Sequence, residues 1–362
     1  MNTILTKMKL CGVLPCVRAE RAETLANALE ALASQGFPCA EADMTAWRYP
    51  DPGAIPLERA GIEIGVRVRD WAEARQALRT GARWATILPG PGETPPVGRM
   101  LFPADSANPA HAPAPPADGH SRGRDGQPVV CDAGTPETMR PNNSVEAMPI
   151  RDCAAAETSV SGLPVAVVPI RDCADVETLA SGRLDAEIPM RGCADAQTLV
   201  QGCTDPERTR RLLALPGVAA VRWPLAALPG KAGEQAENLK RVWALTLGFS
   251  LAHIGINSTR AGESEEIAQS FATLLGMPYT PGPASDYAGT LVEAMKAGGR
   301  GAHGHIGIQT DCLERGMYFA TRSGFAFDPD SRKNDASGRA ILYYLDREIG
   351  GFAIHLLQRQ GG

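Results

Sequence analysis

The sequence predicts an α/β protein in two parts: a parallel sheet or barrel of strand–helix units, followed by a smaller α+β domain. Over residues 10–90, short apolar runs alternate with segments of helical periodicity, which is typical of parallel strands joined by helical crossovers. Near the end of the chain, His253-Ile-Gly-Ile returns as His305-Ile-Gly-Ile. This return indicates a domain built from two copies of one module.

The first part alternates predicted strands with predicted helices. The first strand covers residues 13–17, and the helical stretch after it ends at Gly36, a residue type that suits a helix terminus. Further strands are predicted over residues 38–43, 62–68 and 84–88, and helices over residues 22–34 and 71–79. Helical connections of this kind are what parallel strands require.

The composition changes after residue 90. Residues 91–145 are rich in Pro, Ala, Gly, Asp and Ser and hold few large apolar side chains, so we expect a disordered linker or insertion. His111 and His120 lie in this stretch, and we interpret them as solvated residues rather than metal ligands.

A short internal repeat follows the linker. Its copies open at Met148, Val168 and Ile188, each with a proline next and a Cys-Ala pair soon after. One strand and a helix-like tail per copy fit either a small solenoid or a multiplied strand–helix unit of a barrel. The low apolar content of the copies favours the multiplied unit, so residues 146–230 are grouped with the sheet of residues 1–90.

Composition and charge restrict the partners. The net charge of −5 offers no positive field for nucleic acid or for an anionic membrane surface, so we expect a small-molecule partner and leave a homo-oligomer open. Short, proline-containing apolar runs and an N-terminus without a cleavage pattern favour a cytoplasmic protein with no membrane span. Nine cysteines without a C-x-x-C pair favour reduced thiols, with Cys11 and Cys16 as buried small apolar residues.

The C-terminal domain is predicted over residues 250–362, after a connecting helix at 234–245 within residues 231–249. Its first helix, over residues 265–275, has an apolar face made of Ile267, Phe271, Leu274 and Leu275. Its second helix begins with a capping box of Asp311 and Glu314 and presents Leu313, Met317 and Ala320. Period-two patterns return at residues 290–295, 341–345 and 352–357. We therefore predict two βαβββ modules.

A histidine and a glycine share one face of the first strand in each module. Alternation places His253 beside Gly255, and His305 beside Gly307. The glycine leaves open space beside the imidazole, as a coordination site requires. His303 would share the face of His305, as an outer partner or as an alternative ligand.

Glu293 and His355 each lie among apolar neighbours on a predicted strand. A buried unpaired carboxylate is costly, and a cation offsets that cost. Three histidines and one carboxylate suit a divalent transition metal with open positions for water or a bidentate oxygen substrate. The alternative is a set of hydrogen-bonded histidines at strand ends. Because the residues fall at equivalent points of two modules, we favour the metal.

The motifs of the last domain resemble those of the glyoxalase I and vicinal-oxygen-chelate superfamily over about residues 250–360. The matching segments are Gly304-His-Ile-Gly, Leu291-Val-Glu293 and Gly350-Gly-Phe-Ala-Ile-His355. The resemblance implies one ligand from the first and one from the last strand of each module, namely His253, Glu293, His305 and His355. Glyoxalase I usually has a glutamate where this chain has His355, which disfavours lactoylglutathione lyase activity. The superfamily also includes epimerases, dioxygenases and resistance proteins, so the fold leaves the reaction open.

The first part resembles the 2-keto-3-deoxy-6-phosphogluconate (KDPG) and 4-hydroxy-2-oxoglutarate aldolases, (β/α)8 barrels that release pyruvate through a lysine Schiff base. The matching segments are Gly12-Val-Leu-Pro-Cys-Val-Arg, Gly36-Phe-Pro-Cys-Ala-Glu41, Ile64-Gly65-Val and Ile87-Leu-Pro-Gly90. The resemblance implies an incomplete TIM-type barrel, with Glu41 as the catalytic glutamate. It also implies a fifth strand–helix unit at residues 165–182 and a sixth strand at Val221-Arg222-Trp-Pro224.

This sequence departs from the aldolase pattern at the remaining catalytic positions. The family arginine and threonine are replaced by Thr45 and Val66, and the Schiff-base lysine by Arg222 or Val221. An arginine stays protonated and forms no Schiff base, and no lysine occurs between residues 9 and 231. We therefore predict that aldolase chemistry is lost.

Three hypotheses follow for the function. The first is a metal-dependent vicinal-oxygen-chelate enzyme, fused to a degenerate aldolase-like barrel, that acts on a small oxo- or hydroxy-acid in sugar-acid metabolism. The second is an active pyruvate-releasing aldolase, and the third is a non-catalytic ligand-binding module.

Overall fold

The computed structural model describes residues 3–45, 61–87, 99–101, 165–169, 197–201, 204–215 and 218–360. Its first part has these helices and strands in chain order: α1 (Thr3–Cys11), β1 (Val13–Arg18), α2 (Ala22–Ser34), β2 (Cys39–Asp43), β3 (Glu63–Val68), α3 (Trp71–Arg79), β4 (Ala85–Ile87), β5 (Arg99–Leu101), β6 (Val165–Pro169), β7 (Gln197–Gln201), α5 (Pro206–Leu213), β8 (Val218–Pro224), the short 3-10 turn η3 (Leu225–Ala227) and α6 (Ala232–Leu245).

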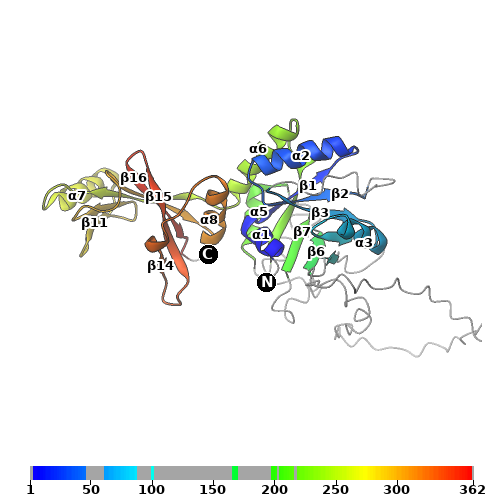
Figure 1. Ribbon diagram of the computed structural model, residues 1–362. Coiled ribbons are helices and arrows are strands. Elements are labelled where there is room, and N and C mark those ends of the chain that lie inside the picture. Colours follow the sequence, from blue (N-terminus) through cyan, green and yellow to red (C-terminus); the bar gives the residue numbers. More distant parts are fainter. Residues whose placement is uncertain are drawn as a thin grey trace, which may run out of the picture.

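The strands of the first part form one curled sheet in the order β5-β4-β3-β2-β1-β8-β7-β6. All neighbours are parallel except β5, which runs antiparallel to β4. The edge strands β5 and β6 contact each other, so the sheet curls back on itself in the manner of a barrel (Figure 1). The α/β class predicted from the alternating pattern is therefore present.

Strand β8 lies where the last strand of a closed barrel would lie. The expectation that residues 221–224 stand in for a sixth strand is therefore wrong in position, since β8 pairs directly with β1, with Leu14 opposite Arg222. Chain order alone could not reveal this, because the pairing depends on how the sheet closes.

Two further expectations about the first part are also corrected. Residues 99–101, assigned to the linker, form β5, and residues 197–201, assigned to a helix-like tail, form β7. Both are short segments whose strand conformation is stabilised by pairing with distant strands. The remainder of the 91–145 segment, with His111 and His120, and the rest of the Met148, Val168 and Ile188 repeat lie outside the described residues.

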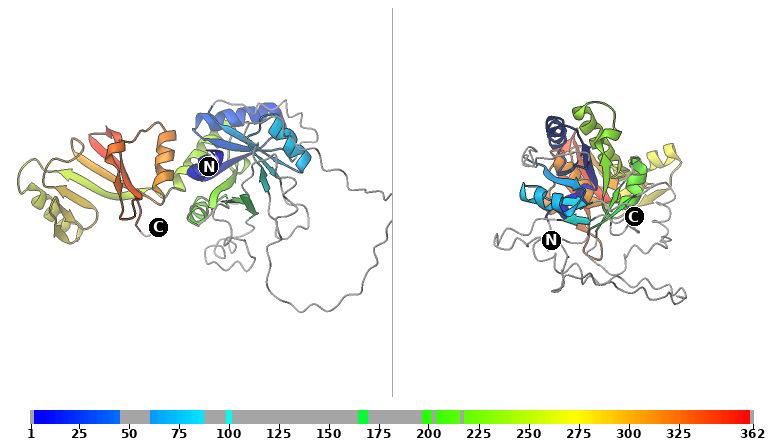
Figure 2. Two further views of the ribbon diagram at one scale, coloured as in Figure 1. Left: turned by 60° about the horizontal axis from the view of Figure 1, so that its bottom comes forward. Right: turned by 90° about the vertical axis from the view of Figure 1, so that its right-hand side faces the viewer.

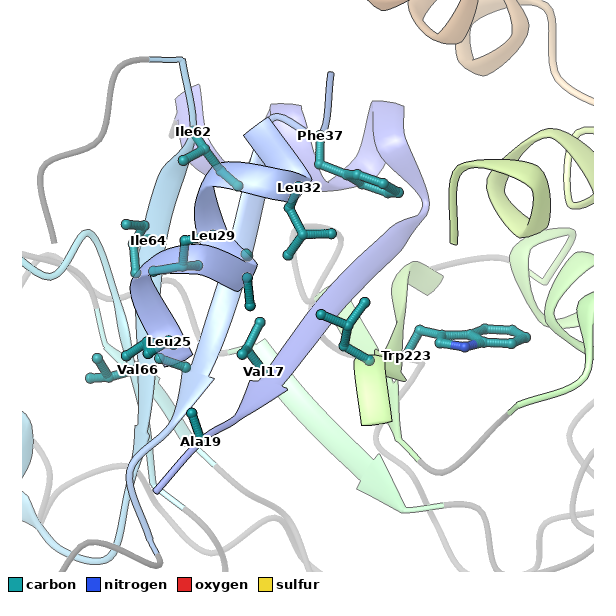
Figure 3. Close-up of a cluster of buried hydrophobic side chains, with 14 of the residues drawn as sticks. Val17, Ala19, Leu25, Leu29, Leu32, Phe37, Ile62, Ile64, Val66 and Trp223 are labelled. Carbon is teal, nitrogen blue, oxygen red and sulfur yellow. The ribbon is translucent and has the colours of Figure 1, made fainter. Parts of the chain in front are cut away.

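Helix α2 covers one face of the sheet with an apolar stripe at helical spacing. Leu25, Leu29 and Leu32 are buried against Val17 and Ile64 (Figure 3). Beside α2 lies α6 (Figure 1), which also contributes to this core.

The interior of the curled sheet is filled from one end by helix α1, an element that the sequence patterns did not predict. Met8 of α1 is buried in a cluster with Leu14 and Trp84. The Trp84 indole lies over Gly65, where any Cβ would overlap it, so this glycine is required by packing. Cys11 and Cys16 are buried free thiols, as expected for small apolar residues.

The last domain contains two modules of identical element order. The first has β9 (Ser250–Asn257), α7 (Glu263–Leu275), β10 (Tyr279–Pro281), β11 (Ser285–Ala288) and β12 (Val292–Met295). The second has β13 (Gly304–Thr310), α8 (Leu313–Arg322), the short 3-10 turn η4 (Pro329–Ser331), β14 (Lys333–Asn334), β15 (Ala340–Ile349) and β16 (Phe352–Gln358). The strands of both modules form one mixed sheet in the order β10-β11-β12-β9-β13-β16-β15-β14, with β9 and β13 antiparallel at its centre. The predicted βαβββ order is thus present twice.

The helices of this domain differ from expectation in their faces and caps. In α7 the buried residues are Ser264, Ala268 and Ala272, whereas Leu274 is 76% exposed. Small side chains at this spacing let the helix approach the sheet closely. In α8 the N-cap is Cys312 and no side chain caps the helix. Asp311 instead pairs with Arg210 and Arg359, because ion pairs from distant segments compete for its carboxylate.

Helix α8 joins the two parts of the molecule, while α7 lies at the far end of the C-terminal sheet (Figure 1, Figure 2). The Phe319 ring meets the Trp243 ring of α6 edge-on at 5.0 Å. Arg315 donates to the carbonyls of Lys9 and Leu213 at 2.9 and 2.8 Å. These contacts satisfy carbonyls in the last turns of α1 and α5. No helix of the described residues has the length and apolarity needed to cross a membrane.

Candidate metal centre

The three histidines predicted as ligands meet on one face of the C-terminal sheet. One ligand nitrogen from each of His253, His305 and His355 lies within 4.8 Å of the others. The Nε2 atoms of His253 and His305 are 3.1 Å apart. The residues come from β9, β13 and β16, so the pairing of these central strands brings them together.

The glycines of the two repeated motifs make room for these rings across the strands. In the β9–β13 ladder, His305 lies opposite Gly255 and His253 lies opposite Gly307. A Cβ on Gly255 would overlap the His305 ring, and a Cβ on Gly307 would overlap the rings of His253 and His355. The open space was expected beside the histidine of the same strand. It is instead occupied by the imidazole of the neighbouring strand.

Glu293 of β12 completes the cluster with one of its two oxygens. Its Oε2 lies 3.3 Å from His305 Nε2 and 3.7 Å from His253 Nε2. Its Oε1 accepts hydrogen bonds from Ser285 Oγ at 2.7 Å and from Tyr287 Oη at 3.2 Å. These two hydroxyl groups fix the carboxylate so that Oε2 faces the imidazoles.

The electrostatics of the cluster favour a carboxylate at Glu293 and neutral imidazoles at His253 and His355. Hydrogen bonding to His305, with support from Ser285, lowers the pKa of Glu293 to about 2. Burial lowers the pKa of His355 to about 3 and that of His253 below its usual 6.5, and the neighbouring imidazoles lower both further. Neutral imidazole and ionised carboxylate are the forms that bind a metal ion.

His355 carries an observation that bears directly on ligand binding. Its side chain is 3% exposed in the core of the sheet, and neither ring nitrogen has a hydrogen-bond partner among the described residues. A buried imidazole without a partner is costly. A cation bound between the three rings and Glu293 would remove that cost, so these residues fit a divalent metal ion.

His303 lies apart from the cluster, so its predicted role beside His305 is wrong. Strand β13 begins only at Gly304, which has a φ of 125°, and this turn breaks the alternation that would place both histidines on one face. The His303 ring packs against Gly351 and lies 5.7 Å from the Phe352 ring.

Residues that sequence reasoning missed surround the cluster. Tyr344 of β15 lies directly opposite His355, with the ring centroids 4.7 Å apart, and the Arg300 guanidinium stacks over the Tyr344 ring at 4.8 Å. Ser285 and Tyr287 belong to β11, a strand of four residues. The spacing of two residues between Ser285 and Tyr287 was the available signal in the sequence. A strand of four residues shows too little periodicity for that signal to be recognised.

Glu41 lies in a second buried cluster, inside the curled sheet. It accepts hydrogen bonds from Arg222 at 2.5 Å, Arg67 at 3.1 Å and Thr86 at 3.0 Å. Burial alone would raise the pKa of Glu41, but the charges of Arg222 and Arg67 and the Thr86 bond outweigh it and lower this pKa below 4.5. Glu41 is therefore held as a carboxylate between two guanidinium groups.

No family model matches the chain, and neither does any curated protein. The chain is similar to a solved structure of 2-keto-3-deoxy-6-phosphogluconate aldolase from Zymomonas mobilis at 16% identity, covering 66% of this chain and 96% of that chain, with a TM-score of 0.36. A second structure of that enzyme, with 3-phosphoglycerate, is 15% identical over 68% of this chain and 97% of that chain, with a TM-score of 0.39. At this distance the likeness supports no conclusion about activity.

Proposed function

We propose that the protein binds one divalent transition-metal ion between His253, Glu293, His305 and His355 and is a metal-dependent enzyme for a small oxo- or hydroxy-acid. The observation that carries this proposal is the convergence of three imidazoles, of which His355 has no hydrogen-bond partner among the described residues, with the oriented carboxylate of Glu293 3.3 Å from His305. A metal held by four protein ligands keeps positions for substrate oxygens and acts as a Lewis acid when bound.

The motif resemblance to the vicinal-oxygen-chelate superfamily supports the same proposal. The element order of each module and the placement of ligand residues on its first and last strands agree with what that resemblance implies. The fourth position holds the neutral imidazole of His355 instead of the glutamate usual in glyoxalase I. With one anionic ligand in place of two, the loaded centre would attract anionic substrates more strongly.

For the barrel, we propose that Schiff-base aldolase chemistry is absent. No lysine occurs between residues 9 and 231, so none of the strands from β1 to β8 carries one, and Arg222 of β8 donates to both Glu41 and Thr86. Incubation with 2-keto-3-deoxy sugar acids is expected to release no pyruvate in a lactate-dehydrogenase-coupled assay. Pyruvate release together with a borohydride-trapped adduct would overturn this part of the proposal.

The metal centre itself is tested by elemental analysis. The purified full chain is expected to carry about one divalent transition-metal ion per chain after dialysis. After chelation, the addition of metal at a large excess over its Kd is expected to stabilise the fold by a few kcal/mol, since only the folded chain assembles the ligands. Absence of stoichiometric metal, with no thermal shift on its addition, would contradict the proposal.

A further inference from the structure

Lys333 lies on the same face of the C-terminal sheet as the candidate metal ligands. It pairs with Leu342 across β14 and β15, and Leu342 pairs with Leu357 of β16. Residues directly opposite one another share a face, as do residues two apart on a strand. The row of Lys333, Leu342 and Leu357 therefore lies next to the row of Tyr344 and His355 on the same face of the sheet.

The Lys333 ammonium group is exposed and has no counter-ion among the described residues. Other lysines near acidic groups are paired: Lys7 with Glu63 at 2.7 Å and Lys296 with Asp286 at 3.4 Å. A positive charge on the same face as imidazoles that would hold a cation is unfavourable, unless an anion completes the site.

Arg300 adds a second, oriented cation at the cluster. Its guanidinium stacks on Tyr344 at 4.8 Å, and its Nη1 donates to Asp328 Oδ2 at 2.7 Å. Because Tyr344 in turn packs on His355, the stacked arginine is positioned near the candidate ligands. Asp328 neutralises Arg300, so the unbalanced charge beside the cluster is that of Lys333.

The charges of the loaded centre can be counted from these residues. A divalent ion with one carboxylate and three neutral imidazoles leaves one positive charge, and Lys333 adds another. A small carboxylate that binds the metal with one or two oxygens would balance one of these two charges, and a dicarboxylate such as oxalate would balance both. An exposed lysine suits such a ligand, because its ammonium is a compact charge on a flexible stem.

We propose that Lys333 is the specificity-determining residue for a carboxylate-bearing ligand of this centre, so that the substrates are small oxo- or hydroxy-carboxylates. This inference rests on the proposed metal centre and deepens it. Arg300 and Tyr344 lie beside the candidate ligands on the side of β15. Lys333 sets affinity for the carboxylate and leaves metal binding unchanged.

The test uses the full chain loaded with Co(II), whose visible spectrum reports ligand binding without an activity assay. Titration with oxalate is expected to be about fivefold weaker for Lys333→Gln than for wild type, and weaker still for Lys333→Glu, with Lys333→Arg close to wild type. Neutral imidazole is expected to bind all four proteins equally. Lys240→Gln, on α6, is the matched control and keeps wild-type oxalate affinity.

The outcomes separate the two proposals. Equal oxalate affinity in wild type and Lys333→Glu, with Co(II) bound to both, would overturn the role of Lys333 alone. Failure of wild type to bind Co(II) would overturn the metal centre and this inference together. Tighter binding of inorganic phosphate than of oxalate would overturn the carboxylate class. A difference between wild type and Lys333→Gln that shrinks at high salt is expected for a charge contact.

Discussion

Replacing His305 by alanine is expected to weaken metal binding by more than about 100-fold, so that the dialysed variant contains almost no metal. The His305 ring is 4% exposed, and its Nε2 lies within 3.3 Å of both His253 Nε2 and Glu293 Oε2. Loss of even an outer partner of a metal ligand costs about 10- to 100-fold, and here a ligand itself is lost. Metal per chain is measured by elemental analysis, with Co(II) titration giving the affinity.

The matched control is His303→Ala, which removes a histidine two residues away. Because His303 packs on Gly351 outside the cluster, this variant is expected to keep its metal and its metal-induced thermal shift. Gly255→Ala tests the geometry without removing a ligand. Its Cβ would overlap the His305 ring, so it should also lose metal. Normal metal content in His305→Ala, or equal loss in His303→Ala, would contradict the four-residue centre.

Replacing Glu41 by alanine is expected to lower the free energy of unfolding of the first part by about 3–5 kcal/mol. Arg222 and Glu41 are both 1% exposed, so the substitution leaves a buried guanidinium without its counter-ion. Two of its nitrogens, Nε and Nη1, already lack partners among the described residues. All tryptophans, at positions 47, 71, 84, 223 and 243, precede residue 250, so tryptophan fluorescence in urea follows mainly this part of the protein.

Glu63→Ala is the control for the Glu41 result. Glu63 pairs with Lys7 and Arg83 at a partly exposed position, and its removal should cost no more than about 1 kcal/mol. The double variant Glu41→Leu with Arg222→Met should recover much of the lost stability, because it removes both buried charges. Equal effects of Glu41→Ala and Glu63→Ala would contradict a buried ionic core.

The Glu41 contribution also has a defined pH dependence. Because the folded-state pKa lies below the ordinary 4.5, the stabilisation is present above that value and is lost as the pH falls toward the folded-state pKa. Wild type should therefore lose more stability than Glu41→Gln on acidification below about pH 4.5, as measured by the same urea titrations.

Local signals in the sequence were sufficient for most elements. Helices α2 and α3 have the predicted bounds. Each is followed by a glycine, Gly36 or Gly81, two residues after its last helical residue. The two modules and the four clustered residues followed from a repeated motif and from strand alternation. These signals depend only on neighbours along the chain, where side-chain periodicity directly reflects the conformation.

Only the tertiary structure decided which strands pair and therefore what each side chain meets. It placed β8 beside β1, gave Asp311 to Arg210 instead of a helix cap, and separated His303 from His305 through the turn at Gly304. Non-local contacts of this kind leave no periodic trace in the sequence. The sequence by itself determined which residues gather at the candidate centre. Strand pairing across β9 and β13 decided that each imidazole fills the space above the glycine of the neighbouring strand.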